Sequence, residues 1–199
     1  MIKKVTVSEI QKLLGYEIEI VAEDTRKSLG EIPVGTTCYI GGVEFIVLEH
    51  DEDSKTTSVI TKDFIAKAPF DENTNDFKNS SLFKKVLLDF YLKIKRVQGG
   101  VYSHIVDLTS DDGRKDYGYC DACVSLLTCD QYRKYVHILD KYRPDGWWWL
   151  ATAYSTSSNG YSRRVRCVYS DGTLSFSNCS FDYGVRPFCI FDSSILISE

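Results

Sequence analysis

The sequence predicts one α+β domain of two main helices and short antiparallel strands, and three observations support this. The 199 residues are 43% hydrophobic and 26% charged, which are ordinary globular values that exclude wholesale disorder. Two stretches, 81–94 and 129–140, carry apolar residues every three or four positions, as amphipathic helices do. The remaining apolar runs are short and separated by turn residues. No repeat or linker divides the chain, so we expect a single domain over 1–199.

The first elements are a short helix and a strand. Thr6 and Glu9 have the spacing of a capping box in front of an apolar stripe, and Gly15 is a helix stop, so the sequence predicts a helix over 7–14. Residues 16–21 alternate between polar and apolar and predict a strand.

A small antiparallel meander is expected next. Gly41-Gly42 separates two β-branched runs within 37–48, a pattern typical of a hairpin. A polar turn at 51–55 leads to a third strand at 57–61. Together these runs predict three adjacent strands.

The two main helices follow. Residues 71–76 form a polar loop, and Ser80 or Ser81 is the expected N-cap of the helix over 81–94. Thr128 and Gln131 have capping-box spacing, which predicts the start of the helix over 129–140. Its expected inward side chains are Tyr132, Tyr135, Val136 and Leu139.

The last part of the chain predicts short β segments. Pro144-Asp145-Gly146 breaks the chain, and Asp171-Gly172 is a hairpin turn signal. The expected segments are 147–151, 164–170, 173–176 and 185–191.

Overall charge and hydropathy exclude several protein classes. The 24 Lys and Arg against 28 Asp and Glu give a net charge of −4, which argues against a dedicated nucleic-acid binder. No run approaches 18 apolar residues, so no membrane span is expected. The first residues lack the apolar core of a signal peptide, so we expect synthesis in the cytoplasm, and the final location stays open between cytoplasm, cell surface and virion.

Lysine and glutamate are distributed unevenly along the chain. Residues 1–149 contain 15 Lys and 9 Glu, whereas 150–198 contain neither. The upstream frequency would place roughly 8 of them in that window. The window also lacks Gln, His, Met and Trp and is rich in Ser, with 11. The two parts of the chain therefore follow different compositional rules.

The cysteines predict a reduced protein. Seven is an odd number, and the chain is too long for a typical disulfide scaffold. Cys120 and Cys123 have CxxC spacing but no second pair follows at the distance a structural zinc needs. Ordinary thiols are the favoured interpretation, and a metal site with Cys129 or a redox pair are the alternatives.

An enzymatic site is not evident from the sequence. His50, His104 and His137 show no paired-ligand spacing, and no Gly-x-Ser-x-Gly is present. His137 is expected to be a packed or surface residue of its helix. We therefore expect no catalytic residue, no metal and no cofactor.

Two segments, 152–164 and 175–183, are rich in Tyr, Ser, Asn and Arg. This composition suits a binding surface, so we expect the candidate ligand-binding residues there. Tyrosine supplies a large contact area at low entropic cost, serine and asparagine supply adaptable hydrogen bonds, and arginine supplies forked and stacking contacts. A polar, irregular sheet edge without a partner is the alternative. At least two residues of Trp147-Trp148-Trp149 are expected in the core, with one available to a binding surface. The candidate ligand-binding residues are Thr152, Tyr154, Ser155, Ser157, Ser158, Tyr161, Arg164, Arg166, Ser175, Phe176, Asn178, Ser180, Phe181 and Tyr183.

Several motifs in order give the chain a family resemblance. Trp148-Trp149-Leu150, then 168–172 (Val-Tyr-Ser-Asp-Gly), then 184–187 (Gly-Val-Arg-Pro) resemble the DUF6273 group, within the formylglycine-generating-enzyme-like branch of C-type lectin folds. The runs 41–48, 59–63, 79–82 and 126–128 also resemble its elements, so the resemblance covers most of the chain. It implies that Arg186 is a buried structural residue, an ion-pair partner or a donor to a backbone carbonyl.

The resemblance also implies a function. Proteins of this fold include targets of diversity-generating retroelements, in which template adenines are copied as random bases. The resulting codons cannot encode Lys, Glu, Gln, Met or Trp, which matches the window 150–198. The expected function is therefore a ligand-binding protein, with a scaffold at 1–149 and a variable, ligand-binding region at 150–192.

The expected partner is a macromolecule, a protein or a surface glycan, with neither nucleic acid nor membrane as partner. A phage or cell-surface assembly partner is a further possibility. The alternative function is a formylglycine-generating-like oxidoreductase or metal protein using Cys167, Cys179 and Cys189.

Overall fold

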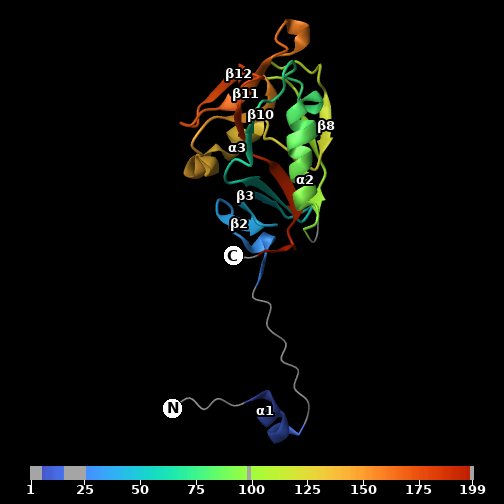
Figure 1. The fold of residues 1–199 in the computed structure, drawn as a ribbon, viewed down its shortest axis with the longest axis vertical. Coiled ribbons are helices and arrows are strands. Elements are labelled where there is room, and N and C mark those ends of the chain that lie inside the picture. Colours follow the sequence, from blue (N-terminus) through green and yellow to red (C-terminus); the bar gives the residue numbers. More distant parts are fainter. Residues whose placement is uncertain (1–5, 16–25, 98–99, 198–199) are drawn as a thin grey trace.

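The computed structural model describes residues 6–15, 26–97 and 100–197, and these form a mixed α+β fold (Figure 1). The helices and single helical turns are α1 Val7–Leu14, η1 Leu29–Glu31, η2 Phe77–Asn79, η3 Leu82–Leu87, α2 Leu88–Ile94, α3 Cys129–Leu139, η4 Asp140–Tyr142 and η5 Ser157–Asn159. The strands are β1 Lys27–Ser28, β2 Thr37–Ile40, β3 Val43–Asp51, β4 Thr56–Thr61, β5 Ala66–Ala68, β6 Val101–Tyr102, β7 His104–Asp107, β8 Tyr119–Ala122, β9 Val124–Ser125, β10 Trp148–Ala153, β11 Arg164–Val168, β12 Leu174–Asn178, β13 Tyr183–Val185, β14 Phe188–Asp192 and β15 Leu196–Ile197. No helix in these ranges is long and apolar enough to span a bilayer.

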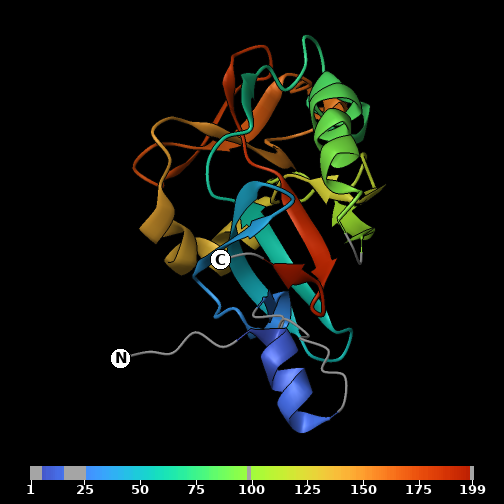
Figure 2. The same ribbon diagram turned by 60° about the horizontal axis from the view of Figure 1, so that its bottom comes forward.

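Two larger sheets organise the described chain. One has the order β2-β3-β4-β14-β6, with β9 also paired to β14, and the other has the order β12-β11-β10-β13-β5. Two small ladders, β7-β8 and β1-β15, complete the pairing. α2 (green) and α3 (gold) flank the strands from two sides (Figure 2). Since β1 pairs with β15, the first and last described strands lie side by side.

The predicted N-terminal helix and meander are confirmed. Thr6 and Glu9 form the capping box of α1, and Gly15 ends it with a left-handed φ of 75°. The hairpin β2–β3 turns at Gly41-Gly42, and β3 pairs with β4 as expected. The predicted strand at 16–21 lies outside the described residues.

Both main helices are confirmed in extent. The expected helix over 81–94 is one helical segment whose first part, Leu82–Leu87, is π-helical and whose second part is α2. In α3 the Thr128–Gln131 capping box is formed. Three of its four expected inward side chains are fully buried and Val136 is partly buried, while His137 is exposed on the surface.

Two expectations for the β segments need correction. The predicted single segment 185–191 is two strands in different sheets, because the chain crosses between the sheets at Arg186-Pro187. Proline has no N–H to donate to a ladder, so it suits this break. The pairing is also not purely antiparallel, since β10 and β13 pair in parallel through Trp148 and Gly184.

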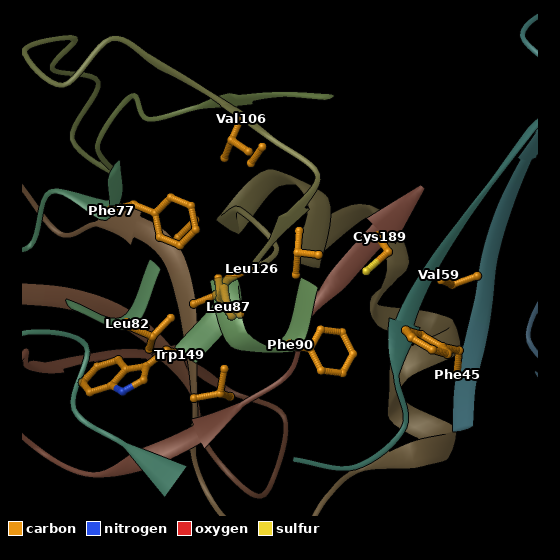
Figure 3. Packing of buried hydrophobic residues seen from close by; sticks show 14 of the residues in the cluster. Phe45, Val59, Phe77, Leu82, Leu87, Phe90, Val106, Leu126, Trp149 and Cys189 are labelled. Carbon is orange, nitrogen blue, oxygen red and sulfur yellow. The ribbon is translucent and has the colours of Figure 1, made fainter. Parts of the chain in front are cut away.

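The core lies on both faces of β10. Trp149 packs into the larger cluster, with Phe70 edge-on at 6.0 Å, and Trp148 packs on the opposite face against Tyr132 of α3 at 5.7 Å. Both tryptophans are buried, whereas Trp147 is 39% exposed. Figure 3 shows Phe90 of α2 pointing toward Phe45 of β3, so α2 packs against the sheet that contains β3.

Arg186 is a buried structural residue, as the family resemblance implied. Its Nε donates to the carbonyl of Thr61 at 3.0 Å, and its guanidinium lies 4.9 Å over the ring of Trp148. Burial lowers the pKa of this guanidinium to about 10, so the group stays charged at neutral pH. It fixes the crossing between the two sheets.

Candidate functional site

The β11–β12 hairpin presents two faces with different chemistry. Arg164 lies opposite Asn178, and Arg166 lies opposite Phe176. Because side chains alternate along a strand, these four residues share one face. Val165 and Cys167, with their partners Ser177 and Ser175, face the other side of the hairpin. Val165 and Cys167 belong to the core cluster of Trp149.

An exposed cluster, here called the aromatic–arginine surface, consists of Tyr154, Tyr161, Arg164 and Phe176. The ring of Tyr154 lies 4.5 Å from that of Phe176 and 5.5 Å from that of Tyr161. The Arg164 guanidinium lies 5.7 Å over the Phe176 ring. Tyr161 is 46% exposed and Phe176 is 41% exposed. Such a cluster offers aromatic contact area and a cation to a partner.

The two arginines on this face of the hairpin, Arg164 and Arg166, differ in whether a carboxylate lies close enough to neutralise them. No carboxylate within the described part of the chain forms an ion pair with Arg164. The largely buried Arg166 lies 3.7 Å from Asp111, which is bound more closely by Arg133 at 3.0 Å. The exposed end of the hairpin is therefore cationic, whereas the end beside α3 is close to neutral.

Two of the predicted ligand-binding residues lie inside the protein. Thr152 is 4% exposed, and its hydroxyl accepts a hydrogen bond from the backbone N–H of Cys129 at the start of α3. Ser155 is 1% exposed and donates to Asp112. Their side chains hold the fold together and are not part of an exposed surface.

The other predicted residues fall on separate parts of the surface. Ser157 and Ser158 are exposed in η5 beside Tyr161, and Ser158 donates to Asp116. Ser180 is partly buried in the turn after β12, where it donates to Asn178. Ser175 points to the opposite face of the hairpin from Phe176.

A second aromatic group, the Trp147 group, is formed by Trp147, Tyr169, Phe181 and Tyr183. Trp147 stacks on Tyr169 at 4.0 Å and meets Tyr183 edge-on at 5.2 Å, and Phe181 lies 6.4 Å from Tyr183. Tyr183 also contacts the buried Trp149. The fourteen predicted residues therefore do not form one surface. Four belong to the aromatic–arginine surface, Phe181 and Tyr183 belong to the Trp147 group, and Thr152 and Ser155 are buried. The remaining six, Ser157, Ser158, Arg166, Ser175, Asn178 and Ser180, lie outside these groups.

A buried asparagine that the sequence analysis did not single out holds the segment 155–164. Asn75 has no exposed surface, and its side-chain nitrogen donates to the carbonyls of Ser155, Tyr161 and Arg164 at 2.7–2.8 Å. Its side-chain oxygen accepts from the hydroxyl of Tyr117 at 2.6 Å. We call this arrangement the Asn75 clamp. The Asp- and Asn-rich loop 71–76 gave no signal for it in sequence, since any of its polar residues could have been exposed.

Residues 112–117, in the loop before β8, also hold the segment 155–164 by hydrogen bonds. The Asp112 carboxylate accepts from Ser155 at 2.7 Å, and the Asp116 carboxylate accepts from Thr156 and Ser158. The pKa of both carboxyl groups is lowered, mainly by these and other serine hydrogen bonds. Tyr117 adds an acceptor for the N–H of Ser157. Three side chains of residues 112–117 therefore position the turn around η5.

The cysteines are poorly suited to act as thiolates. Six of the seven are buried, and only Cys123 is partly exposed. Burial raises the pKa of Cys167 to about 12 and also raises that of Cys179 and Cys189, and the thiolate is the form that attacks or binds metal. Among the described residues no group of three or more His, Cys, Asp or Glu side chains is placed to hold a metal ion.

A comparison with known families gives one finding. Residues 108–193 match the family model described as "Domain of unknown function (DUF6273)". This part of the chain, which is less than half of it, is therefore similar to the DUF6273 family. The match includes β8 to β14 and all of the motifs between 126 and 187 that carried the resemblance, whereas the runs 41–48, 59–63 and 79–82 lie outside it. No curated protein and no solved structure matches the chain.

Proposed function

We propose that the protein is a ligand-binding protein that displays a variable side-chain surface on a fixed backbone, diversified by a retroelement. Its fold would be a C-type lectin fold of the formylglycine-generating-enzyme-like branch, which rests on the order of motifs in the sequence. Its target is a macromolecule, a protein or a surface glycan on a cell or virion. The role requires no catalytic group.

The Asn75 clamp is the observation that carries this proposal. Asn75 binds only backbone carbonyls in the segment 155–164. A backbone carbonyl is the same in every residue, so side chains in this segment can change without loss of these bonds. The clamp lies in the part of the chain that contains Lys and Glu, and the segment it holds lies in the part that lacks both. A variable binding protein needs this arrangement, in which a constant residue holds the backbone of a segment whose side chains vary.

The exposed side chains have the chemistry of a binding surface. The aromatic–arginine surface contains two tyrosines, a phenylalanine and an arginine, a composition similar to that of interface hot spots. The serines of η5 lie at its edge and supply small hydrogen-bonding groups. Affinity would come from the aromatic side chains, and the surrounding serines would adapt to the partner.

Sequencing of the source locus tests the diversification. We expect a near-copy of the coding segment for residues 150–185 close to the gene, differing at template adenines, and a reverse transcriptase gene nearby. If neither is present, the retroelement part of the proposal fails.

A display library tests the binding role directly. Residues Ser157, Tyr161, Arg164, Phe176 and Asn178 would be randomised together on the full chain, with a matched library at five exposed scaffold positions as the control. We expect most members of the first library to stay folded and to yield binders to a test protein such as lysozyme. A library that is mostly unfolded, or that yields no more binders than the control, contradicts the proposal. Stoichiometric copper or zinc in the purified chain, lost on Cys167→Ser, would favour the oxidoreductase alternative.

A further inference from the structure

β12 is the last strand of its sheet, and one of its two edges has no partner strand in the described chain. The sheet order β12-β11-β10-β13-β5 places β11 on one side of β12 and no described strand on the other (Figure 1). All five residues of β12, Leu174–Asn178, pair with Arg164–Val168 without a shift of register. The free edge is therefore regular over the whole length of the strand.

Two residues of β12 direct their backbone polar groups out from this edge. Just after the strand, the N–H of Cys179 donates to the carbonyl of Arg163 at 2.9 Å. Hydrogen-bonded pairs alternate along an antiparallel ladder, so every second residue before Cys179 bonds to β11. The residues between them, Leu174 and Phe176, present both N–H and C=O to the outside. No group of the described residues bonds to these four backbone atoms.

The sequence of β12 does not protect this edge against pairing. Proteins commonly guard a sheet edge with lysine, proline, a bulge or an inward-pointing charge. β5, the strand at the other end of the same sheet, has only three residues, with the exposed Lys67 at its centre. β12 reads Leu-Ser-Phe-Ser-Asn and contains neither a charge nor a proline. An edge of this kind favours the addition of a further strand.

Arg164 extends from β11 toward the free edge. Its guanidinium lies 5.7 Å over the ring of Phe176, which belongs to the edge strand. No carboxylate in the described part of the chain forms an ion pair with it. Side chains of an added strand would alternate between the two faces of the sheet, so every second one would lie on the face of Phe176. A carboxylate at such a position would pair with Arg164.

We propose that the partner of this protein presents an extended, acidic polypeptide segment, which adds to the free edge of β12 as a further strand. The inference rests on the proposed function and narrows its target to a protein. In recognition by strand addition, main-chain hydrogen bonds give affinity and alternate side chains give specificity. The N–H and C=O groups at positions 174 and 176 stay the same when the side chains there change. One docking mode therefore serves different variants of the surface.

The backbone groups and the charge favour such a segment over a glycan or a second copy of this chain. A strand repeats its outward N–H and C=O every two residues, about 7 Å apart, which is the spacing between Leu174 and Phe176. A glycan lacks a backbone of alternating amide donors and acceptors. The β12 of a second copy would bring Leu174, Phe176 and Asn178 to this face, and none of these side chains is an anion for Arg164.

Panning of phage-displayed random peptides, about seven residues long, on the full chain tests the proposal. We expect binders with Asp or Glu at alternate positions, and Phe176→Pro should weaken their binding about ten-fold more than Phe176→Ala. Both variants remove the ring, but only proline removes the outward N–H, and an edge strand tolerates proline where that N–H faces solvent. Equal losses in the two variants, binding of an anionic glycan such as heparin but of no peptide, or the absence of any peptide binder overturns the proposal.

Amide hydrogen exchange followed by NMR gives a second measurement on the unmodified chain. With a selected peptide at saturation, the amide of Phe176 should exchange about ten-fold more slowly than in the free chain. The amide of Ser177 faces β11 and should exchange slowly in both states. A peptide that binds without slowing exchange at Phe176 overturns the proposal. Binders from the display library described above that leave the amides at 174 and 176 unprotected would retain the proposed function and exclude strand addition.

Discussion

The Asn75 clamp and the aromatic–arginine surface involve the same short stretch of chain, yet they use different atoms of it. The clamp binds the carbonyls of Ser155, Tyr161 and Arg164 from inside. The surface uses the side chains of Tyr161 and Arg164 from outside. At Tyr161 and Arg164 stability and recognition therefore use the backbone and the side chain separately, so a side-chain change at these two positions need not cost the fold.

The largest expected effect comes from removing the clamp. Asn75→Ala leaves the carbonyls of Ser155 and Tyr161 without the donor that they bind and the Tyr117 O–H without its acceptor, and each such group costs about 1–3 kcal/mol. We expect the free energy of unfolding in urea to fall by about 4 kcal/mol. Asn73→Ala, at an exposed position in the same loop, is the control and should change it little. A loss below about 1 kcal/mol for Asn75→Ala would show that the segment is held by other contacts.

A somewhat smaller loss is expected where the two large sheets meet. A Cβ added at Gly184 would lie 2.3–2.5 Å from the ring of Phe64, so Gly184→Ala must displace that ring. We expect a loss of about 3 kcal/mol in the free energy of unfolding. In a Phe64→Ala background the same substitution should cost much less, and a double-mutant cycle measures the difference. Equal costs in both backgrounds would rule out this clash as the cause.

The free energy of unfolding should depend on pH through the buried His104 and not through an exposed histidine. His104 lies against Phe188, and burial lowers the pKa of its imidazole from the ordinary 6.5. The unfolded chain therefore binds a proton at higher pH than the folded protein, so stability falls as the pH drops below about 6.5, with a slope of at most about 1.4 kcal/mol per pH unit. Urea titrations from pH 7 to 5 should show this slope, and His104→Gln should remove it. His137→Gln, at an exposed position, should leave it intact.

The smallest effects are expected at the aromatic–arginine surface. Tyr161→Ser and Arg164→Ser each remove exposed side-chain contacts but keep the carbonyls that Asn75 binds. We expect each to change the free energy of unfolding by about 0.5 kcal/mol. Thermal unfolding of both variants beside Asn75→Ala gives the comparison. A loss from either that approached the loss from Asn75→Ala would contradict the separation of roles.

The sequence predicted the local elements well because their signals are local. Two capping boxes and a glycine pair placed α1, α3 and the β2–β3 hairpin correctly. Each of these signals involves residues within a few positions of one another, so no tertiary information was needed. The π-helical start of the segment Leu82–Ile94 was not predicted, since the apolar spacing is compatible with both kinds of helix.

The site was harder to predict because it depends on contacts that are distant in sequence. Whether Thr152 faces solvent is decided by the start of α3, where Cys129 donates to it. The role of Asn75 depends on carbonyls 80–89 residues away. Composition identified the segment that forms the surface, but only the pairing of β11 with β12 shows that Phe176 and Ser175 point to opposite faces.

The crossing at Arg186-Pro187 has a consequence for how the chain folds during synthesis. β13 joins β10 to β5 in one large sheet, and β14 joins β4 to β6 in the other. A nascent chain that stops short of Tyr183 lacks the joining strand of both sheets, although their partner strands have long been made. Neither sheet can then close before residues 183–192 leave the ribosome. We therefore expect the two sheets to be completed together, in one cooperative step.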